Sequence, residues 1–253
     1  MLHLAVRGLL VPQDHSEEPA IVLLQKIRAE KDRLIAAGKI KRDKLLAPIA
    51  DEEKPFELPV GWEWAPVQAL AHVGTGTTPS RDNAAYFSDT GIPWVTSGET
   101  GQSLIKKTDQ FVTARALSET SLTLYPVGTL IVAMYGQGKT RGQVAELRIE
   151  AATNQACAAI VLVESSDHHR QFVKLVFEKS YDEIRNLAAG GAQPNLNVGK
   201  VKQTLISLPP LAEQSRIIAR VEQLRQLCAG LRQRLTASRA TQGQLAEALV
   251  AGC

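Results

Sequence analysis

The last forty residues carry the pattern that most restricts how this chain can fold. From Ile217 onward, apolar residues recur in steps that alternate between four and three, and no proline interrupts the series. Such a heptad repeat predicts one long helix with a narrow apolar stripe, which a second helix must cover. We call this stripe the seam. Ser238 and Gln242 interrupt it, and its apolar members are Ile217, Val221, Leu224, Cys228, Leu231, Leu235, Leu245 and Leu249.

The aromatic residues divide the chain into three parts. All twelve lie between Phe56 and Tyr181. Because aromatic side chains dominate the cores of globular units, we expect a globular domain over 55–210. A helical spacer and linker over 1–54 precede it, and a coiled-coil helix over 211–253 follows it. The last part carries six basic and three acidic residues, so most of the net charge of +3 is expected on the helix.

The apolar patterns of the middle part predict an α+β fold. The segments 129–135 and 158–163 are typical of buried strands, and 143–149 alternates like a half-exposed strand. An amphipathic helix is expected around residues 172–187, with Asp167 as its cap. In the first part, a helix is expected to begin at Ser16 as the N-cap and to stop at Gly38.

Several classes of protein are excluded by composition. The three cysteines are far apart and do not pair with histidines at metal-ligand spacing, which favours a reducing cytoplasm over a disulfide or zinc framework. No apolar run approaches the roughly 18 residues of a membrane span, and the first residues do not resemble a secretory signal. Because no nucleophile elbow, metal cluster or carboxylate pair is evident, we expect a chain that is not an enzyme and holds no cofactor.

One short motif offers an enzymatic alternative. Gly138-Lys139-Thr140 matches the end of a phosphate-binding loop, but that pattern requires a glycine where Ala133 stands. It also requires a helix after Thr140, where a strand is predicted. A nucleotide-using enzyme built on this motif would bind ATP, so a binding measurement decides this alternative.

Three polar, glycine-rich loops are the candidate binding elements, at 74–83, 135–143 and 190–202. Gln, Asn, Arg and Lys side chains read base edges, while Ser, Thr and Lys hold phosphates. The middle part is slightly acidic, so DNA binding would require the basic loop residues to share one face. The other interpretation is that these are ordinary exposed loops. The residues we expect to contact DNA are Thr78, Ser80, Arg81, Gln137, Lys139, Arg141, Asn195 and Lys200.

Five stretches together carry a family resemblance: 4–13, 56–64, 76–80 with 91–95, 188–197 and 208–217. Their most specific members are Phe-Glu-Leu-Pro-Val-Gly-Trp-Glu-Trp at 56–64 and Leu-Pro-Pro-Leu-Ala-Glu-Gln-Ser-Arg-Ile at 208–217. Across nearly the whole chain, the sequence resembles one half of the DNA-specificity (S) subunit of type I restriction–modification systems.

This resemblance implies a non-catalytic subunit that recognises double-stranded DNA. In such systems two recognition domains, separated by antiparallel helices, read a bipartite target. Methyltransferase (M) subunits modify adenines with S-adenosylmethionine, and a restriction (R) subunit cleaves with ATP and Mg. The sequence departs from the family by having a single recognition domain. It is therefore either a half-sized subunit that forms a homodimer or pairs with another half subunit, or the second half of a split or truncated subunit.

Two other arrangements remain open from the sequence. The seam could fold back onto the chain's own helix at 16–38, either in place of pairing with a second chain or together with it. Alternatively, the chain is a coiled-coil interaction or regulatory protein whose loops bind protein rather than DNA.

Overall fold

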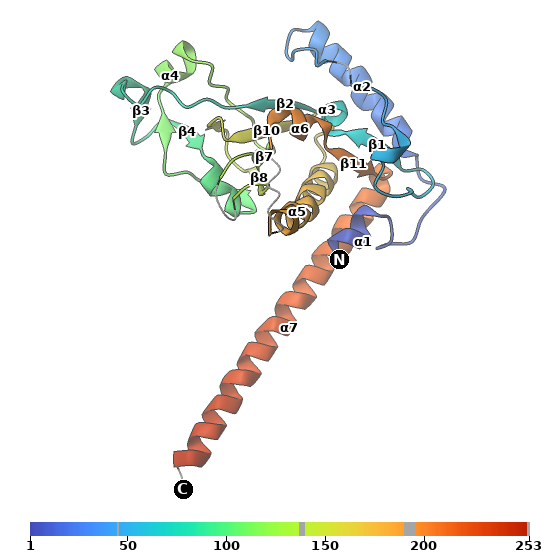
Figure 1. Cartoon of the computed structure of the whole chain (residues 1–253), viewed down its shortest axis with the longest axis vertical. Helices are drawn as coiled ribbons and strands as arrows, with labels where there is room; N and C mark the ends of the chain where they lie inside the picture. Colours follow the sequence, from blue (N-terminus) through green and yellow to red (C-terminus); the bar gives the residue numbers. More distant parts are fainter. Residues whose placement is uncertain (45, 137–139, 190–195, 252–253) are drawn as a thin grey trace.

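A computed structural model of the chain describes residues 1–44, 46–136, 140–189 and 196–251, without the side chains of 182–189, Leu245 and 248–251. The predicted α+β fold is confirmed. A globular body contains mixed sheets and helices, and one long helix projects from it (Figure 1). Within the described residues, no helix is long and apolar enough to cross a membrane.

A five-stranded sheet forms the centre of the body, in the order β2-β10-β7-β8-β5. Neighbouring strands are antiparallel except β8 and β5, which are parallel. The predicted strands at 129–135 and 158–163 are present as β7 and β10. The strands are β2 (Ala71–Thr75), β5 (Leu104–Ile105), β7 (Leu130–Ala133), β8 (Val144–Leu147) and β10 (Cys157–Leu162).

Both faces of this sheet are covered. Leu130 and Val132 of β7 point into one apolar cluster, whereas Ile131 between them points into another. The prediction of a half-exposed strand at 143–149 is wrong, because every residue of β8 is buried. Glu146 is fully buried there, since Arg170 neutralises its carboxylate at 2.9 Å. The charged residue Glu146, which makes this strand look half-exposed in the sequence, is therefore one partner of a buried ion pair.

Two smaller sheets flank the central one. The first has the order β3-β6-β4-β9 and packs around the buried Trp94. The second consists of β1 and β11, which are antiparallel, so the chain enters and leaves the body on adjacent strands. These strands are β3 (Phe87–Ser88), β4 (Ile92–Val95), β6 (Phe111–Val112), β9 (Ala152–Thr153), β1 (Glu63–Pro66) and β11 (Leu205–Leu208).

Helices cover the body on several sides. The predicted amphipathic helix is α5 (Asp167–Ala189), which packs against α1 (Leu2–Val6) and the start of α7 (Leu211–Ala251). Asp167 lies inside the first turn of α5, where it forms an ion pair with Arg170. The short helices α3 (Val67–Leu70) and α4 (Ala114–Glu119) connect strands, and α6 (Val198–Gln203) lies between α5 and β11 in the chain.

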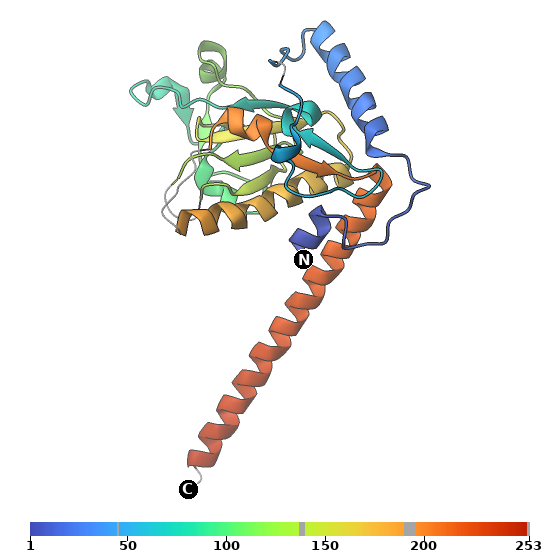
Figure 2. The same ribbon diagram turned by 45° about the vertical axis from the view of Figure 1, so that its right-hand side comes forward.

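The predicted helix of the first part is α2 (Ala20–Ala36). Gly38 ends it with a φ of +68°, as expected, but Ser16 is not its cap. Instead Pro19 occupies the N-cap position, and the amide and hydroxyl of Ser16 both donate to Asp14. Helix α2 packs against α3 and lies away from the outer part of α7 (Figure 2). The alternative in which the seam folds onto this helix is therefore wrong.

The predicted coiled-coil helix is present as α7, one uninterrupted helix of 41 residues. Its first seam residues, Ile217 and Val221, are buried in the body. Leu224 is half-buried, and farther out Leu231 and Leu235 are 58% and 59% exposed. Helix α7 thus leaves the body after about three turns and presents its outer seam uncovered (Figure 1).

Candidate functional site

One edge of the five-stranded sheet gathers two of the three predicted loops. Thr75 ends β2, Ala133 ends β7, and Cys157 begins β10; they lie at the same end of the sheet because Thr75 is opposite Ala158 and Cys157 is opposite Ala133. We call this end the loop edge. The segment after β2 and the segment between β7 and β8 both emerge there, so the sheet topology brings the loops at 74–83 and 135–143 together.

The first loop is held by contacts that leave little freedom. A Cβ atom on Gly76 would lie 1.7 Å from the carbonyl oxygen of Thr153, so only glycine fits. The amide of Thr77 donates to that same carbonyl at 3.0 Å. The indole of Trp94 donates to the carbonyl of Thr77 at 3.2 Å. The stretches 76–80 and 91–95 therefore contact each other, and this contact positions the loop.

The predicted side chains of this first loop differ in how far they reach into solvent. Ser80 and Arg81 are exposed, and the Arg81 guanidinium lies over the Phe87 ring, 5.6 Å from its centre. Thr78 is half-buried and donates its hydroxyl to Gln155, in the turn before β10. The Arg81 side chain is thus a solvent-exposed charge that stacks on an aromatic ring. The Thr78 hydroxyl, in contrast, is already engaged in a hydrogen bond within the protein.

In the second loop, Gln137 and Lys139 lie outside the described residues. Arg141 is half-buried beside the turn at Gly142, whose φ is +83°. The strand β8 follows Thr140, as the pattern at 143–149 predicts, in place of the helix that a phosphate-binding loop requires. Tyr135 is 47% exposed at the loop edge, and sequence reasoning did not single it out. Its position after an apolar run was the available signal.

In the third loop, Asn195 lies outside the described residues. Lys200 is exposed on α6, which packs against β2 and α3. Asn197 caps this helix by accepting the amide of Lys200 at 2.9 Å. Lys200 therefore belongs to a helix above β2, and the described contacts do not bring it to the loops of Arg81 and Arg141.

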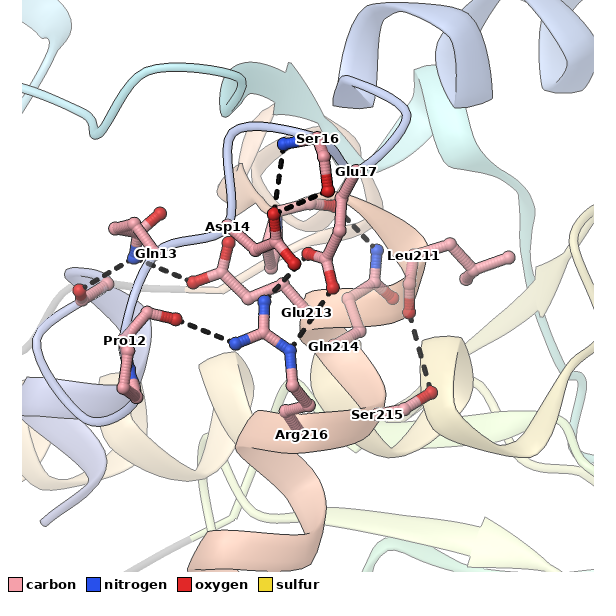
Figure 3. Close-up of polar contacts among 12 residues, drawn as sticks. Pro12, Gln13, Asp14, Ser16, Glu17, Leu211, Glu213, Gln214, Ser215 and Arg216 are labelled. Carbon is pink, nitrogen blue, oxygen red and sulfur yellow. Dashed lines mark hydrogen bonds and ion pairs between the residues drawn. The ribbon is translucent and has the colours of Figure 1, made fainter.

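A second constellation, which sequence reasoning did not resolve, lies around the first turns of α7, where this helix begins against the body (Figure 3). It joins the segment before α2, the entry to β1, helix α5 and the first turns of α7. We call it the α7 junction, and its members are Gln13, Glu17, Trp62, His169, Glu213, Gln214 and Arg216.

Arg216 is the point where the N-terminal segment is tied to α7. Its guanidinium donates to both carboxylate oxygens of Glu17, at 3.2 and 2.7 Å, and to the carbonyl of Pro12 at 2.7 Å. Such a two-pronged contact fixes direction as well as distance, because the guanidinium and the carboxylate are both planar. The hydrogen bonds to Glu17, and to a lesser extent its negative charge, raise the pKa of Arg216.

Glu213 ties α7 to the entry of the body. One carboxylate oxygen accepts the indole N–H of Trp62 at 2.8 Å, and the other accepts the amide of Gln13 at 2.7 Å. Glu213 is only 1% exposed. Burial raises the pKa of this carboxyl, while the hydrogen bonds from Trp62 and Gln13 and the charge of Arg216 oppose that rise.

Gln214 ties α7 to α5. Its carbonyl oxygen lies 2.9 Å from Nδ1 of the fully buried His169, and its amide donates to the carbonyl of Pro209 at 2.9 Å. Because the Gln214 oxygen can only accept, His169 carries its proton on Nδ1 when neutral. Burial lowers the pKa of His169, so the neutral form is favoured in the folded chain.

Body and helix together define a class of protein: an α+β domain with a loop-bearing edge, joined to the start of one long helix that projects from it. Residues 59–237 match the family described as the type I restriction modification DNA specificity domain. The chain belongs to this family. Specificity subunits are non-catalytic and lack cofactors; S-adenosylmethionine belongs to the methyltransferase subunit and ATP to the restriction subunit.

Two curated relatives from Escherichia coli match nearly the whole chain. The type I restriction enzyme EcoEI specificity subunit is 30% identical over 259 residues, and the EcoAI specificity subunit is 29% identical over 256 residues. Each alignment covers 98% of this chain and 43% of the relative. The chain thus spans less than half the length of these relatives, which agrees with the single recognition domain expected from the sequence.

Two solved structures share the fold. The HsdS subunit from Thermoanaerobacter tengcongensis superposes with a TM-score of 0.54 at 18% identity, over 84% of this chain and 48% of that chain. A chain from a study of complex assembly and conformational transition of the type I R-M system gives 0.59 at 17% identity, over 88% and 54%. The helix α7 and the body therefore occur together in other proteins of this kind.

Proposed function

We propose that this chain is the sequence-specific double-stranded DNA recognition subunit of a type I restriction–modification complex, and that each chain reads one half of a bipartite target. In this proposal residues 55–210 form the recognition domain, residues 1–54 the spacer and linker that precede it, and residues 211–253 the helix that sets spacing and docks partners. The chain itself carries out no chemistry.

One observation supports this function most strongly: the loop edge. The two contacts that hold Gly76 and Thr77 give the first loop a rigid base, from which Ser80 and Arg81 reach solvent. Arg141 emerges from the adjacent loop. A first loop with a fixed base that carries hydroxyl and arginine groups, with a second arginine in the adjacent loop, suits contacts to phosphates and base edges.

The outer seam supports a second helix as partner. Leu231 and Leu235 are more than half exposed on the projecting part of α7, and large apolar side chains in a row are normally covered in a functional assembly. A second copy, or another half subunit, would lie antiparallel to α7 and place two recognition domains at opposite ends. A symmetric pair would read a palindromic bipartite site.

The remaining partners belong to the same proposal. Methyltransferase subunits with S-adenosylmethionine modify adenines at the site that this chain selects, and a restriction subunit with ATP and Mg joins them for cleavage. The complex acts in the cytoplasm.

Mapping of methylated adenines across the genome, in cells in which the system is active, tests the proposal. We expect two short conserved blocks separated by a fixed number of unspecified base pairs, with palindromic blocks if two copies of this chain pair. Loss of the modification on deletion of this chain is part of the expected result. Methylation that is unchanged by the deletion contradicts the proposal.

A gel shift separates DNA recognition from the protein-binding alternative. A pool of randomised duplexes, offered to the chain with and without its methyltransferase partner, should yield an enriched sequence in the presence of the partner. An unenriched pool together with stable binding to the protein partner favours a coiled-coil interaction protein.

A further inference from the structure

We propose that the α7 junction fixes the direction in which α7 leaves the body, and that Arg216 and Glu213 are positioning residues which thereby set the separation of the two half-sites. This inference rests on the proposed function, because a separation exists only if each chain reads one half of a bipartite target.

Because α7 is long, a small rotation at its root, where it joins the body, moves the far end of α7 by a large distance. Its part beyond the body, from Leu224 to Ala251, is about 40 Å long at a rise of ~1.5 Å per residue. A rotation of ~10° at the root would move the far end by about 7 Å, or two base-pair steps of ~3.4 Å. A complex that distinguishes separations differing by one base pair must therefore hold this root to within a few degrees.

Apolar packing alone does not supply such a restraint. The buried seam residues Ile217 and Val221 hold α7 against the body, but hydrophobic contact has no preferred direction. Hydrogen bonds do, because they weaken steeply when the donor–hydrogen–acceptor angle departs from linearity. The polar contacts of the junction are therefore groups able to fix an angle, and the ion pair of Arg225 with Glu178 of α5 adds one more polar contact farther along α7.

These contacts approach α7 from different sides. At roughly 100° per residue, Glu213, Gln214 and Arg216 point in three different directions around the helix axis. They engage three separate elements: the entry to β1 through Trp62, helix α5 through His169, and the segment before α2 through Glu17. Figure 3 shows the contact between Arg216 and Glu17. Three restraints around one axis fix the direction of that axis, whereas one or two would leave a hinge.

The α7 junction also resists small changes in the direction of α7. The buried carboxylate of Glu213 loses both of its donors if α7 tilts, and an unpaired buried charge is costly. Arg216 would lose the planar two-pronged contact with Glu17, which a lysine could not replace. Small tilts are therefore opposed at every contact.

Spin-label distance measurements on the full chain test the angular restraint directly. Labels are attached at Ser118→Cys on α4 and Ala237→Cys on α7, in a background carrying Cys228→Ser and Cys253→Ser. Cys157 stays, because it is buried and burial raises the pKa of its thiol to about 12. An excess of unlabelled chain suppresses distances between copies.

The parent should give a single narrow distance distribution, and Arg216→Ala should widen it at least twofold. Arg216→Lys, which keeps the charge, should give an intermediate width and guards against a folding defect in the alanine variant. The matched control is Arg220→Ala, because Arg220 donates to Gln223 on α7 itself. An unchanged width in both Arg216 variants overturns the proposal.

A methylation assay with the methyltransferase partner tests the consequence for DNA. Duplexes carry both half-sites at the native separation or one or two base pairs longer or shorter. Arg216→Ala should reduce the preference for the native separation at least threefold while base changes within a half-site keep their effect. A uniform loss at all separations would mean that Arg216 is merely structural and would overturn the spacing role.

The two experiments fail separately. If the parent modifies no bipartite site while Arg216→Ala still widens the distance distribution, the proposed function and the spacing role are both overturned, and the angular restraint stands. If the parent is specific and the distance distribution stays narrow in the Arg216 variants, the proposed function stands and the α7 junction does not set the separation of the half-sites.

Discussion

Gly76 shows how a single residue determines the position of the first loop, at 74–83. Its backbone lies so close to the Thr153 carbonyl that any side chain would collide with it, and Trp94 holds the next peptide. The loop is therefore fixed from both sides at its base. Side chains farther along, such as Arg81, begin from a defined position, which lowers the entropy lost when a ligand binds.

At this residue scale we predict that Arg81→Ala weakens DNA binding by the assembled complex. Arg81 is exposed and supported on Phe87, so its loss should remove about one unit of the salt dependence of binding and leave sequence preference intact. Titrations at several salt concentrations measure both effects. Arg33→Ala, an exposed arginine on α2 that pairs with Glu30, is the control and should bind like the parent. Equal affinity of the Arg81 variant at matched salt would remove Arg81 from the interface.

The buried His169 makes a pH prediction. Burial lowers the pKa of His169 in the folded chain below its ordinary value of 6.5. As pH falls through 6.5, the unfolded chain therefore takes up a proton that the folded chain does not, and the free energy of unfolding decreases. His169→Gln keeps a donor for Gln214 but does not titrate. Urea unfolding between pH 5 and 8 should show that the parent loses more stability on acidification than this variant. Parallel curves would mean that His169 is not buried as described.

At the scale of the element, contacts with the body stabilise only the first part of α7. Its first seam residues pack into the body, and Arg225 pairs with Glu178 of α5 at the point where the helix leaves. Beyond that point the described side chains are exposed. An isolated helical rod with an apolar stripe gains most of its stability from a partner helix.

We predict that Leu231→Asp prevents self-association or partner docking. A charge in the middle of the seam would be buried without a partner in any helix pair. Gln233→Asp adds the same charge on the opposite face and should associate like the parent. Sedimentation of the chain alone and with its methyltransferase partner distinguishes the variants. Normal assembly by Leu231→Asp would place the contact on another face of α7.

The elements differ in how far the sequence predicts them. β7, β10 and α7 follow from long apolar runs or repeats, which depend on neighbouring residues only. Glu146 was misjudged because its partner Arg170 is 24 residues away and no local pattern announces the pair. The junction was missed for the same reason: Trp62 and Glu213 are separated by 151 residues. The motifs at 56–64 and 208–217 marked its location but not the contact between them.

The candidate DNA-contacting residues were predicted from loop chemistry, and topology decides which of them meet. Sheet order brings the loops of Arg81 and Arg141 to one edge, a fact that depends on the register between β2, β10 and β7. Lys200 was assigned to a loop but lies on α6. Composition cannot reveal that difference, because a six-residue helix capped by Asn197 has no periodic signal.

At the scale of the whole molecule, the body should fold without the outer helix. Removal of residues 229–253 deletes side chains that are exposed where they are described, so we expect the melting temperature to change by less than about 2 °C. Removal of 218–253 also deletes the buried Val221 and should lower it by several degrees, since burial of such a side chain contributes roughly 1.5–3 kcal/mol. Thermal melts of both truncations decide this. Equal melting temperatures for the two would mean that α7 contributes nothing to the core.

The antiparallel pairing of β1 with β11 has a consequence for how such proteins diversify. Entry and exit strands lie side by side, with Trp64 opposite Ser207 and Pro66 opposite Leu205. The residues between these two strands form a segment whose two ends lie side by side. Adjacent ends are the condition under which one domain is inserted in place of another. Except for His169, the residues of the α7 junction lie outside this segment. Exchange of residues 67–204 between related chains would therefore replace the loops of the body, while the contacts of Glu213 with Trp62 and of Arg216 with Glu17 stay in place.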